Sequence, residues 1–445
     1  MSNELIALLD GVQVGRVQRD KHGRMSFTYA DGWLTKQGAY PISLSMPLAL
    51  RQHNHEKIDA YLWGLLPDNE NILAKWGQRY HVSPRNAFGL IEKVGEDCAG
   101  AVQFIRPDRL QYLEEQSGEV EWLPDTQIAD RLRGLIADHS AWRRIGDSGQ
   151  FSLAGAQAKT AFLRAGDRWG IPSGRIPTTH IFKPPIPDFD GHAENEHFCL
   201  ELAGRLGFAV PISFVRNFED QIAIIIERYD RVPDAGRVLR VHQEDICQSL
   251  GIPPTRKYEA DHGPGAKQVV DLLRANSTDP LEDIDTFILA LGFNWLIAGT
   301  DGHAKNYSVL IGAESVVRLA PMYDVASALP YSVFDPYSTK LAMRVGGEYR
   351  LRNIGQRQWR KLANELGVNE GQLIDRLTLF AKRIPDEAND VGRHLQSQGL
   401  KHPIVIKMAD AIADRARNCL DVLKLGSGLD DNTNSGETSP QTSPH

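Results

Sequence analysis

The chain has 445 residues, of which 42% are hydrophobic and 24% are charged, a composition typical of a globular protein with two or three domains. Its formal net charge of −7 does not give the overall basic surface of a protein that binds nucleic acid alone, so DNA binding would need a partner or a local patch. No apolar run reaches the roughly 18 residues of a membrane helix, and the first residues lack a signal-peptide pattern. We therefore expect a cytoplasmic protein without membrane contact.

Four cysteines lie far apart in the chain, at Cys98, Cys199, Cys247 and Cys419. They form no C-x-x-C pair, which argues against both a zinc cluster and a disulfide framework. We expect them to be reduced residues that pack in the interior.

The amino-terminal hundred residues are rich in strand patterns. The runs 4–9, 12–17 and 24–29 are short and apolar, and Asp-Gly and His-Gly turns separate them. A helix follows, with apolar residues at helical spacing up to Leu65, and Pro67 ends it.

A polar stretch near 110–125, rich in Glu and Gln, has the composition of a connection. The sequence thus predicts a β-rich amino-terminal module over 1–107 and a connecting helical segment over 108–148.

The next elements follow the order of a kinase amino-terminal lobe, expected over 149–238. A small-residue loop at 152–159 leads into strand patterns that end at Lys183. An amphipathic helix from Glu194 to Gly207 follows, and then two further strand patterns run to Ile226.

Beyond residue 240 the pattern becomes helical. The segment 284–297 is apolar nearly all round, which predicts a helix buried at the centre of a lobe. Three amphipathic stretches are expected to cover it, at 359–366, 370–380 and 404–423. The predicted fold class is α+β, a two-lobed protein-kinase-like fold with an added amino-terminal β module and an all-helical carboxy-terminal lobe over 239–425. The last residues, 426–445, are polar and predict a disordered tail.

The strongest chemical motif is Asp301-Gly-His-Ala-Lys-Asn306 followed by Asp324. In a protein kinase a loop Asp accepts the proton of the substrate hydroxyl, and an Asn five positions later and a second Asp hold Mg²⁺. The intervening segment predicts a β-hairpin, which would return Asp324 to the side of Asn306. A D-G-x-x-x-N stretch alone is more often an ordinary loop, so the second Asp is needed for this interpretation.

Lys183 ends a strand pattern with apolar neighbours. Such a lysine either extends to solvent or binds α and β phosphates while a helix glutamate orients it. Glu196 is the expected partner, with Glu194 as the alternative. The loop 152–159 could cradle phosphates through backbone N–H groups, although it matches no standard phosphate-binding motif and could be an ordinary connection.

Other polar residues allow two interpretations each. Glu227 ends an apolar strand and either begins an adenine-binding hinge or faces solvent. His303 could contact phosphate or position its loop, and Lys305 could balance the transferred phosphoryl group or be a surface lysine. The segment 242–245 could fix the catalytic loop or cap a helix.

Together these motifs resemble the HipA-type toxin kinases, the serine/threonine kinase half of bacterial type II toxin–antitoxin pairs. The resemblance covers nearly the whole chain except the tail. The matching stretches are 41–47, 65–70, 94–102, 152–159, 177–183, 226–231, 242–248, 257–259, 263–265, 299–306 and 321–324.

The resemblance implies ATP and Mg²⁺ as cofactors and a role for each matching residue. It implies that Asp301 is the proton acceptor, that Asn306 and Asp324 hold Mg²⁺, and that Ser152 is autophosphorylated, which would expel its loop. The residues that would contact ATP are Ala154, Gly155, Ala156, Gln157, Ala158, Lys159, Lys183, Glu227, Arg228, Tyr229, His303 and Tyr323.

The resemblance also implies partners. These are a helix-turn-helix antitoxin dimer of the HipB kind, operator DNA bound mainly through that antitoxin, and a protein substrate such as an aminoacyl-tRNA synthetase. Arg360 and Lys361 are candidate DNA contacts, although Glu365 and Gly367 stand near where basic residues are expected. A catalytically idle corepressor and a kinase of a lipid or small metabolite remain alternatives.

Overall fold

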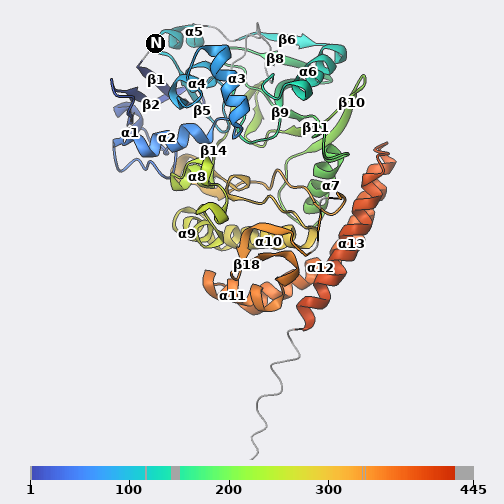
Figure 1. Ribbon diagram of the computed structural model, residues 1–445. Helices are drawn as coiled ribbons and strands as arrows, with labels where there is room; N and C mark the ends of the chain where they lie inside the picture. Colours follow the sequence, from blue (N-terminus) through green and yellow to red (C-terminus); the bar gives the residue numbers. More distant parts are fainter. Residues whose placement is uncertain (1–2, 116–117, 142–150, 333, 336, 426–445) are drawn as a thin grey trace, which may run out of the picture.

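The computed structural model describes residues 3–115, 118–141, 151–332, 334–335 and 337–425. The predicted tail at 426–445 lies outside the described residues, as does the boundary placed at 148–149. Figure 1 shows two parts stacked along the long axis, with the larger β-sheets and helices α1 to α6 in the upper part and helices α9 to α13 in the lower one.

The amino-terminal module is a five-stranded antiparallel sheet, with α2 and α4 packed on one face and α5 on the other. The three predicted strands are confirmed as β1 (Glu4–Leu9), β2 (Val12–Arg19) and β3 (Met25–Tyr29), and the sheet order is β4-β3-β2-β1-β5. The predicted helix is α2, which ends before Pro67. The remaining elements are α1 (Asp31–Leu34), β4 (Gln52–His53), α2 (His55–Gly64), α3 (Glu70–Tyr80), α4 (Ala87–Val94), β5 (Val102–Ile105) and α5 (Pro107–Glu115).

A second, six-stranded sheet forms the upper lobe, in the order β10-β11-β9-β7-β8-β6. The helix α6 covers one face through Ile128 and Leu132, which share a core with Phe182. The helix α7 packs on the other side, against β10 and β11. The bounds are β6 (Val120–Leu123), α6 (Asp125–Ala137), β7 (Thr160–Ala165), β8 (Arg168–Pro172), β9 (His180–Lys183), α7 (His192–Arg205), β10 (Ser213–Phe218) and β11 (Gln221–Glu227).

The segment predicted as a connection contributes to this sheet. The strand β6 pairs antiparallel with β8, with Trp122 opposite Gly170. A side chain at Gly170 would meet Val120 at 2.4 Å, so the glycine allows this close pairing.

The lower lobe is built around α10 (Pro280–Ile297), whose carboxy-terminal eleven residues are all buried. This confirms the central helix that the apolar run predicted. It is covered by α9 (Ala266–Asn276), α11 (Gln356–Leu366), α12 (Glu370–Ser397) and α13 (Ile404–Leu425). The helix α12 continues well past the predicted end at residue 380 and contains Pro385.

The prediction of an all-helical lower lobe is wrong, because two small sheets lie in it. The predicted hairpin is present as β15 (Ser308–Ile311) and β16 (Val317–Leu319), and it pairs with β14 (His242–Asp245). A second hairpin joins β17 (Lys340–Val345) and β18 (Glu348–Arg350). A third, β12 (Arg231–Asp234) with β13 (Arg237–Arg240), follows the upper sheet, and α8 (Ile246–Leu250) follows β14.

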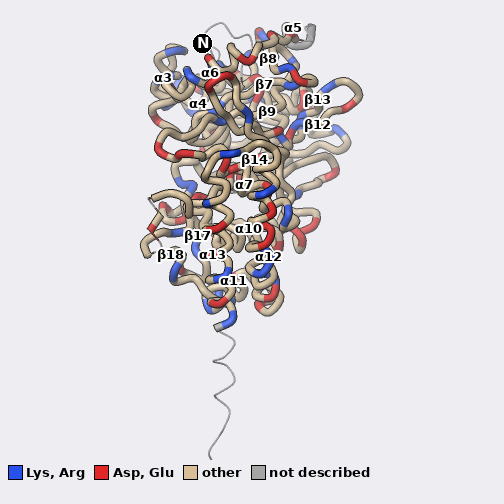
Figure 2. Tube along the Cα trace, turned by 90° about the vertical axis from the view of Figure 1, so that its right-hand side faces the viewer, with Lys and Arg blue, Asp and Glu red and all other residues tan. Residues whose placement is uncertain are grey.

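The distribution of charged residues and the state of the cysteines are those expected from the composition. Figure 2 shows acidic and basic residues interspersed along one side of the molecule, without a continuous basic stretch. All four cysteines are free and buried, as predicted. None of the helices within the described ranges is both long and apolar enough to cross a bilayer.

Candidate active site

A cavity of about 670 Å³ lies where the upper lobe, the lower lobe and the amino-terminal module meet. Residues far apart in the sequence line it together, including Lys183 from β9, Glu196 from α7 and Asp324 from the lower lobe. The other predicted site residues in its wall are Ala154, Gly155, Ala156, Gln157, Ala158, Lys159, Glu227, Arg228, Tyr229, Asp301, His303, Asn306 and Tyr323. The candidate residues outside it are Ser152, Arg360 and Lys361.

Lys183 joins two carboxylates from different elements. Its Nζ lies 2.6 Å from Glu196 Oε1 and 2.7 Å from Asp324 Oδ1. Glu194 is buried as well but makes no ion pair with Lys183, so Glu196 is the partner. Burial alone would lower the pKa of Lys183, but the charges of Asp324 and Glu196 outweigh it and raise the pKa above its ordinary value. The lysine is therefore held as a cation at the floor of the cavity.

Asn306 and Asp324 lie side by side and present oxygens to the cavity. Asn306 Nδ2 donates to the Asp324 carbonyl at 3.3 Å, while Asn306 Oδ1 is buried without a hydrogen-bond partner among the described residues. Burial would raise the pKa of Asp324, but the ammonium groups of Lys183 and Lys159 lower it, so the carboxylate is ionised. An orphaned amide oxygen beside a carboxylate fits Mg²⁺, which prefers oxygen ligands.

Asp324 has the left-handed backbone conformation that side chains other than glycine and asparagine rarely adopt, with φ of 59°. The preceding Tyr323 helps to hold this turn, because its hydroxyl donates to the Lys305 carbonyl at 2.7 Å. Backbone strain of this kind is often found at functional sites.

The catalytic-loop candidate Asp301 is exposed at the mouth of the cavity. The loop begins where α10 ends, at Ala298 with φ of 54°. The His303 backbone N–H donates to the Asp301 carbonyl at 2.7 Å. Burial lowers the pKa of His303, which keeps the imidazole neutral and favours a role in shaping the loop.

Lys305 is buried, which excludes the interpretation of this residue as a surface lysine. Its Nζ lies 3.0 Å from Asp68 Oδ1 of the amino-terminal module and 3.6 Å from Asp245 Oδ2. Asp245 also caps α8 through the Gln248 backbone N–H. The helix-cap interpretation of the segment 242–245 is therefore confirmed, and the same residue also contacts Lys305 of the loop.

The phosphate-loop candidate is stabilised by its own lysine and by the amino-terminal module. Lys159 Nζ donates to the Ala154 carbonyl at 2.7 Å, and Gly155 has φ of 102°, which only glycine adopts readily. Burial and the nearby charge of Lys183 lower the pKa of Lys159 to about 8. Ser152 is buried, and its hydroxyl donates to the Leu65 carbonyl at 2.6 Å.

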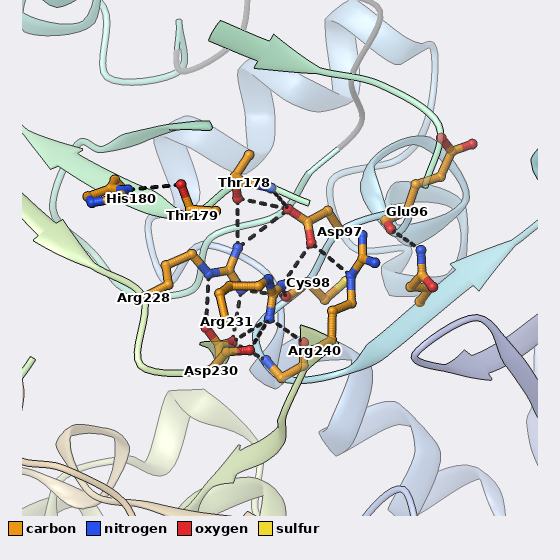
Figure 3. Close-up of polar contacts among 12 residues, drawn as sticks. Glu96, Asp97, Cys98, Thr178, Thr179, His180, Arg228, Asp230, Arg231 and Arg240 are labelled. Atoms are coloured by element: carbon orange, nitrogen blue, oxygen red, sulfur yellow. Dashed lines mark hydrogen bonds and ion pairs between the residues drawn. The ribbon is translucent and has the colours of Figure 1, made fainter. Parts of the chain in front are cut away.

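Arg228 lines the cavity, but its side chain has a structural role. Its guanidinium points into a buried ion cluster, where it donates to Asp230 and to the Cys98 carbonyl (Figure 3). Its backbone N–H is also engaged, with the Thr179 carbonyl. Tyr229 does face the cavity, where its hydroxyl bonds Gln243 and its ring lies 5.9 Å from that of Tyr323.

Three residues at the site were missed from the sequence. Asp68 reaches the catalytic loop, Asp97 organises the cluster beside Arg228, and the Tyr258 hydroxyl lies 2.7 Å from Asp301 Oδ1. All three fall in stretches that match the family pattern. That match was the only signal in the sequence, because their partners lie more than 40 positions away.

Comparison with known proteins shows the family of the chain. Residues 5–105 match the model of the HipA N-terminal domain, and residues 151–388 match that of the HipA-like C-terminal domain. The chain belongs to the HipA family of kinases. The second model alone spans more than half of the sequence.

Individual relatives match over most of their length. The Y4mE protein of Sinorhizobium fredii is 33% identical over 92% of this chain and 96% of its own. The serine/threonine-protein kinase toxin HipA of Shewanella oneidensis is 30% identical over 82% of this chain and 83% of its own. The solved Shewanella oneidensis complex of HipA, HipB and operator DNA contains a chain that matches with a TM-score of 0.81 at 25% identity, over 95% of this chain and 98% of that one. The two-lobed kinase-like fold is thereby confirmed.

Proposed function

We propose that this HipA-family protein is an ATP- and Mg²⁺-dependent serine/threonine protein kinase that acts in the cytoplasm as the toxin of a toxin–antitoxin pair. The observation that supports this most is the contact of Lys183 with both Glu196 and Asp324 in a cavity that also contains Asn306 and Asp301. These are the side chains that phosphoryl transfer needs, in the order found in protein kinases.

Each side chain has a defined task in this proposal. Lys183 binds the α and β phosphates while Glu196 keeps its ammonium group in place. Asn306 and Asp324 would hold Mg²⁺, which would supply neutralisation of the phosphate charge. Asp301 accepts the proton of a serine or threonine hydroxyl as that oxygen attacks the γ-phosphorus. The loop from Ala154 to Lys159 covers the phosphates, and Glu227 and Tyr229 border the adenine.

Autophosphorylation of Ser152 would switch the enzyme off. The Ser152 hydroxyl is buried and donates to the Leu65 carbonyl. This position therefore fits a hydroxyl donor but not an added phosphoryl group. A phosphate dianion cannot occupy this position beside a carbonyl oxygen, since both groups accept hydrogen bonds and burial penalises the charge. The loop from Ala154 to Lys159 would then leave the cavity, and ATP binding would be lost.

The proposed partners follow from the family. A HipB-like helix-turn-helix antitoxin would hold the kinase inactive on operator DNA, as the HipA–HipB–DNA assembly of Shewanella oneidensis suggests. Arg360 and Lys361 lie on α11 and are candidate DNA contacts, although Lys361 Nζ already lies 3.7 Å from Glu365. The substrate is proposed to be a protein of translation, such as an aminoacyl-tRNA synthetase.

The test is transfer of ³²P from labelled ATP to the purified protein and to dephosphorylated casein as a generic acceptor. We expect wild-type transfer and at least about 100-fold less for Asp301→Gln, because a general base contributes 10²-fold or more. Equal transfer by both proteins would refute the proposal. Binding of ATP without transfer would instead favour an idle corepressor, and transfer only to a lipid or metabolite would identify a small-molecule kinase.

A further inference from the structure

The carboxylate of Asp301 is not free, because a tyrosine from a separate segment holds one of its oxygens. Tyr258 Oη lies 2.7 Å from Asp301 Oδ1. An ionised carboxylate only accepts hydrogen bonds, so the phenol is the donor. No other hydrogen bond to this carboxylate is present among the residues that the structure describes. One oxygen, Oδ2, therefore remains available for a substrate hydroxyl.

The phenol stays protonated at neutral pH. Burial raises the pKa of Tyr258, and the hydrogen bond to Asp301 raises it further. The tyrosine therefore acts as a constant donor and does not compete with Asp301 for the substrate proton.

Tyr258 is built into a turn that is attached to the catalytic loop. Its ring meets the ring of His303 edge to face, with the centroids 4.8 Å apart. The Ala304 N–H donates to the Lys257 carbonyl at 3.3 Å, which ties the two segments together.

The turn itself depends on a glycine. Gly263 N–H donates to the Tyr258 carbonyl at 2.9 Å, and a Cβ on Gly263 would lie 2.0 Å from the Arg256 carbonyl oxygen. A loop that requires such close backbone approach fixes the direction of the side chain that it carries. The position of the phenol is thus set by the fold and not by the carboxylate alone.

We propose that Tyr258 is a positioning residue for phosphoryl transfer, which holds Asp301 Oδ1 so that Oδ2 faces the substrate hydroxyl. The proposal rests on the kinase function proposed above. In the transfer step the hydroxyl proton passes to Oδ2, the hydroxyl oxygen bonds to the γ-phosphorus, and the bond from that phosphorus to the β–γ bridging oxygen breaks to leave ADP. Tyr258 keeps its proton throughout.

The test compares Tyr258→Phe with wild type in the full-length protein. The phenylalanine keeps the ring against His303 and removes only the hydroxyl, so a residue that merely packs would tolerate the change. We expect the rate of ³²P transfer at saturating ATP to fall roughly tenfold, since misplacing a reacting group costs about this much or more. The ATP concentration that gives half the maximal rate should stay unchanged, because Tyr258 does not line the nucleotide cavity.

A matched control is Tyr349→Phe, which removes a hydroxyl from a neighbouring tyrosine whose ring lies beside Arg344 and not beside Asp301. It should transfer phosphate at the wild-type rate. A Tyr258→Phe rate equal to wild type overturns the inference, and so does a faster rate, which would mean that the phenol blocks the substrate position. A change in the half-saturating ATP concentration alone would also overturn it. Wild-type protein that transfers no phosphate would refute the proposed function itself, and the role of Tyr258 with it.

Discussion

Asp97→Asn is expected to destabilise the protein strongly, because Asp97 is the centre of a buried ion cluster (Figure 3). Its carboxylate accepts hydrogen bonds from the backbone N–H and the hydroxyl of Thr178, at 3.0 and 2.8 Å. The guanidinium groups of Arg231, Arg240 and Arg228 lie 2.8, 3.4 and 3.5 Å from it. The cluster joins the amino-terminal module to the strand ends that border the nucleotide cavity.

The expected loss in the free energy of unfolding follows from the charges that remain buried in the variant. In the variant, Arg228 and Arg231 keep Asp230 as a carboxylate partner, while the buried Arg240 loses its ion pair. Removing one partner of a buried ion pair typically costs about 3–5 kcal/mol, because the other charge stays buried and uncompensated. Asparagine has nearly the same volume as aspartate, so no cavity forms and the loss is electrostatic.

The assay is urea unfolding at pH 7, with the free energy of unfolding obtained by linear extrapolation. Asp271→Asn is the matched control, since Asp271 forms an exposed pair with Lys267 at 2.7 Å and should lose less than about 1 kcal/mol. A loss at Asp97→Asn no larger than that of the control would refute the reasoning.

The pH dependence gives an independent check. Burial would raise the pKa of Asp97, but the three arginines outweigh it and hold the pKa below its unfolded value of about 3.9. Stability from a carboxylate with a depressed pKa is fully present above the unfolded pKa and is lost as the pH falls below it. The difference between wild type and Asp97→Asn should thus be constant from about pH 5 to 8 and shrink below about pH 4.

Three further predictions concern the nucleotide. Lys183→Ala should lower ³²P transfer by about 10²-fold, as loss of a preorganised cation does, and an unchanged rate would contradict its role. Lys159 has a pKa lowered to about 8 by burial and by Lys183, so ATP affinity measured by calorimetry should weaken as the pH rises from 7 to 9. The variant Lys159→Arg should lack this trend, because arginine stays charged. Ser152→Ala should abolish self-phosphorylation at that site in mass spectrometry while ATP binding persists; equal phosphate on another residue would oppose it.

Local patterns in the sequence predicted the regular core well. The residues of β3 alternate buried and half-buried from Met25 to Tyr29, and this period of two was readable in advance. The apolar run of α10 likewise identified the buried helix. The order of Asp301, Asn306 and Asp324 gave the candidate site because a hairpin between them is a local feature.

Elements that depend on tertiary contacts were not readable. The strand β6 carries the exposed Trp122 and a glutamate, which is the pattern of a polar linker until it pairs with β8. The helix α12 contains Pro385, a residue that normally ends a helix, and packing against α13 compensates. Asp97 and Tyr258 act through partners brought close only by the fold, so no spacing rule reveals them.

The central claim is that Asn306 and Asp324 hold a divalent cation with the nucleotide beside Lys183. It is tested most directly by titrating Mn²⁺ into the protein with a non-hydrolysable ATP analogue and measuring free Mn²⁺ by electron paramagnetic resonance. We predict that wild type and Asp301→Asn bind the ion equally. Asp324→Asn should bind it at least about tenfold more weakly, since the change removes a charged oxygen ligand. Equal Mn²⁺ binding by Asp324→Asn and wild type would contradict the account.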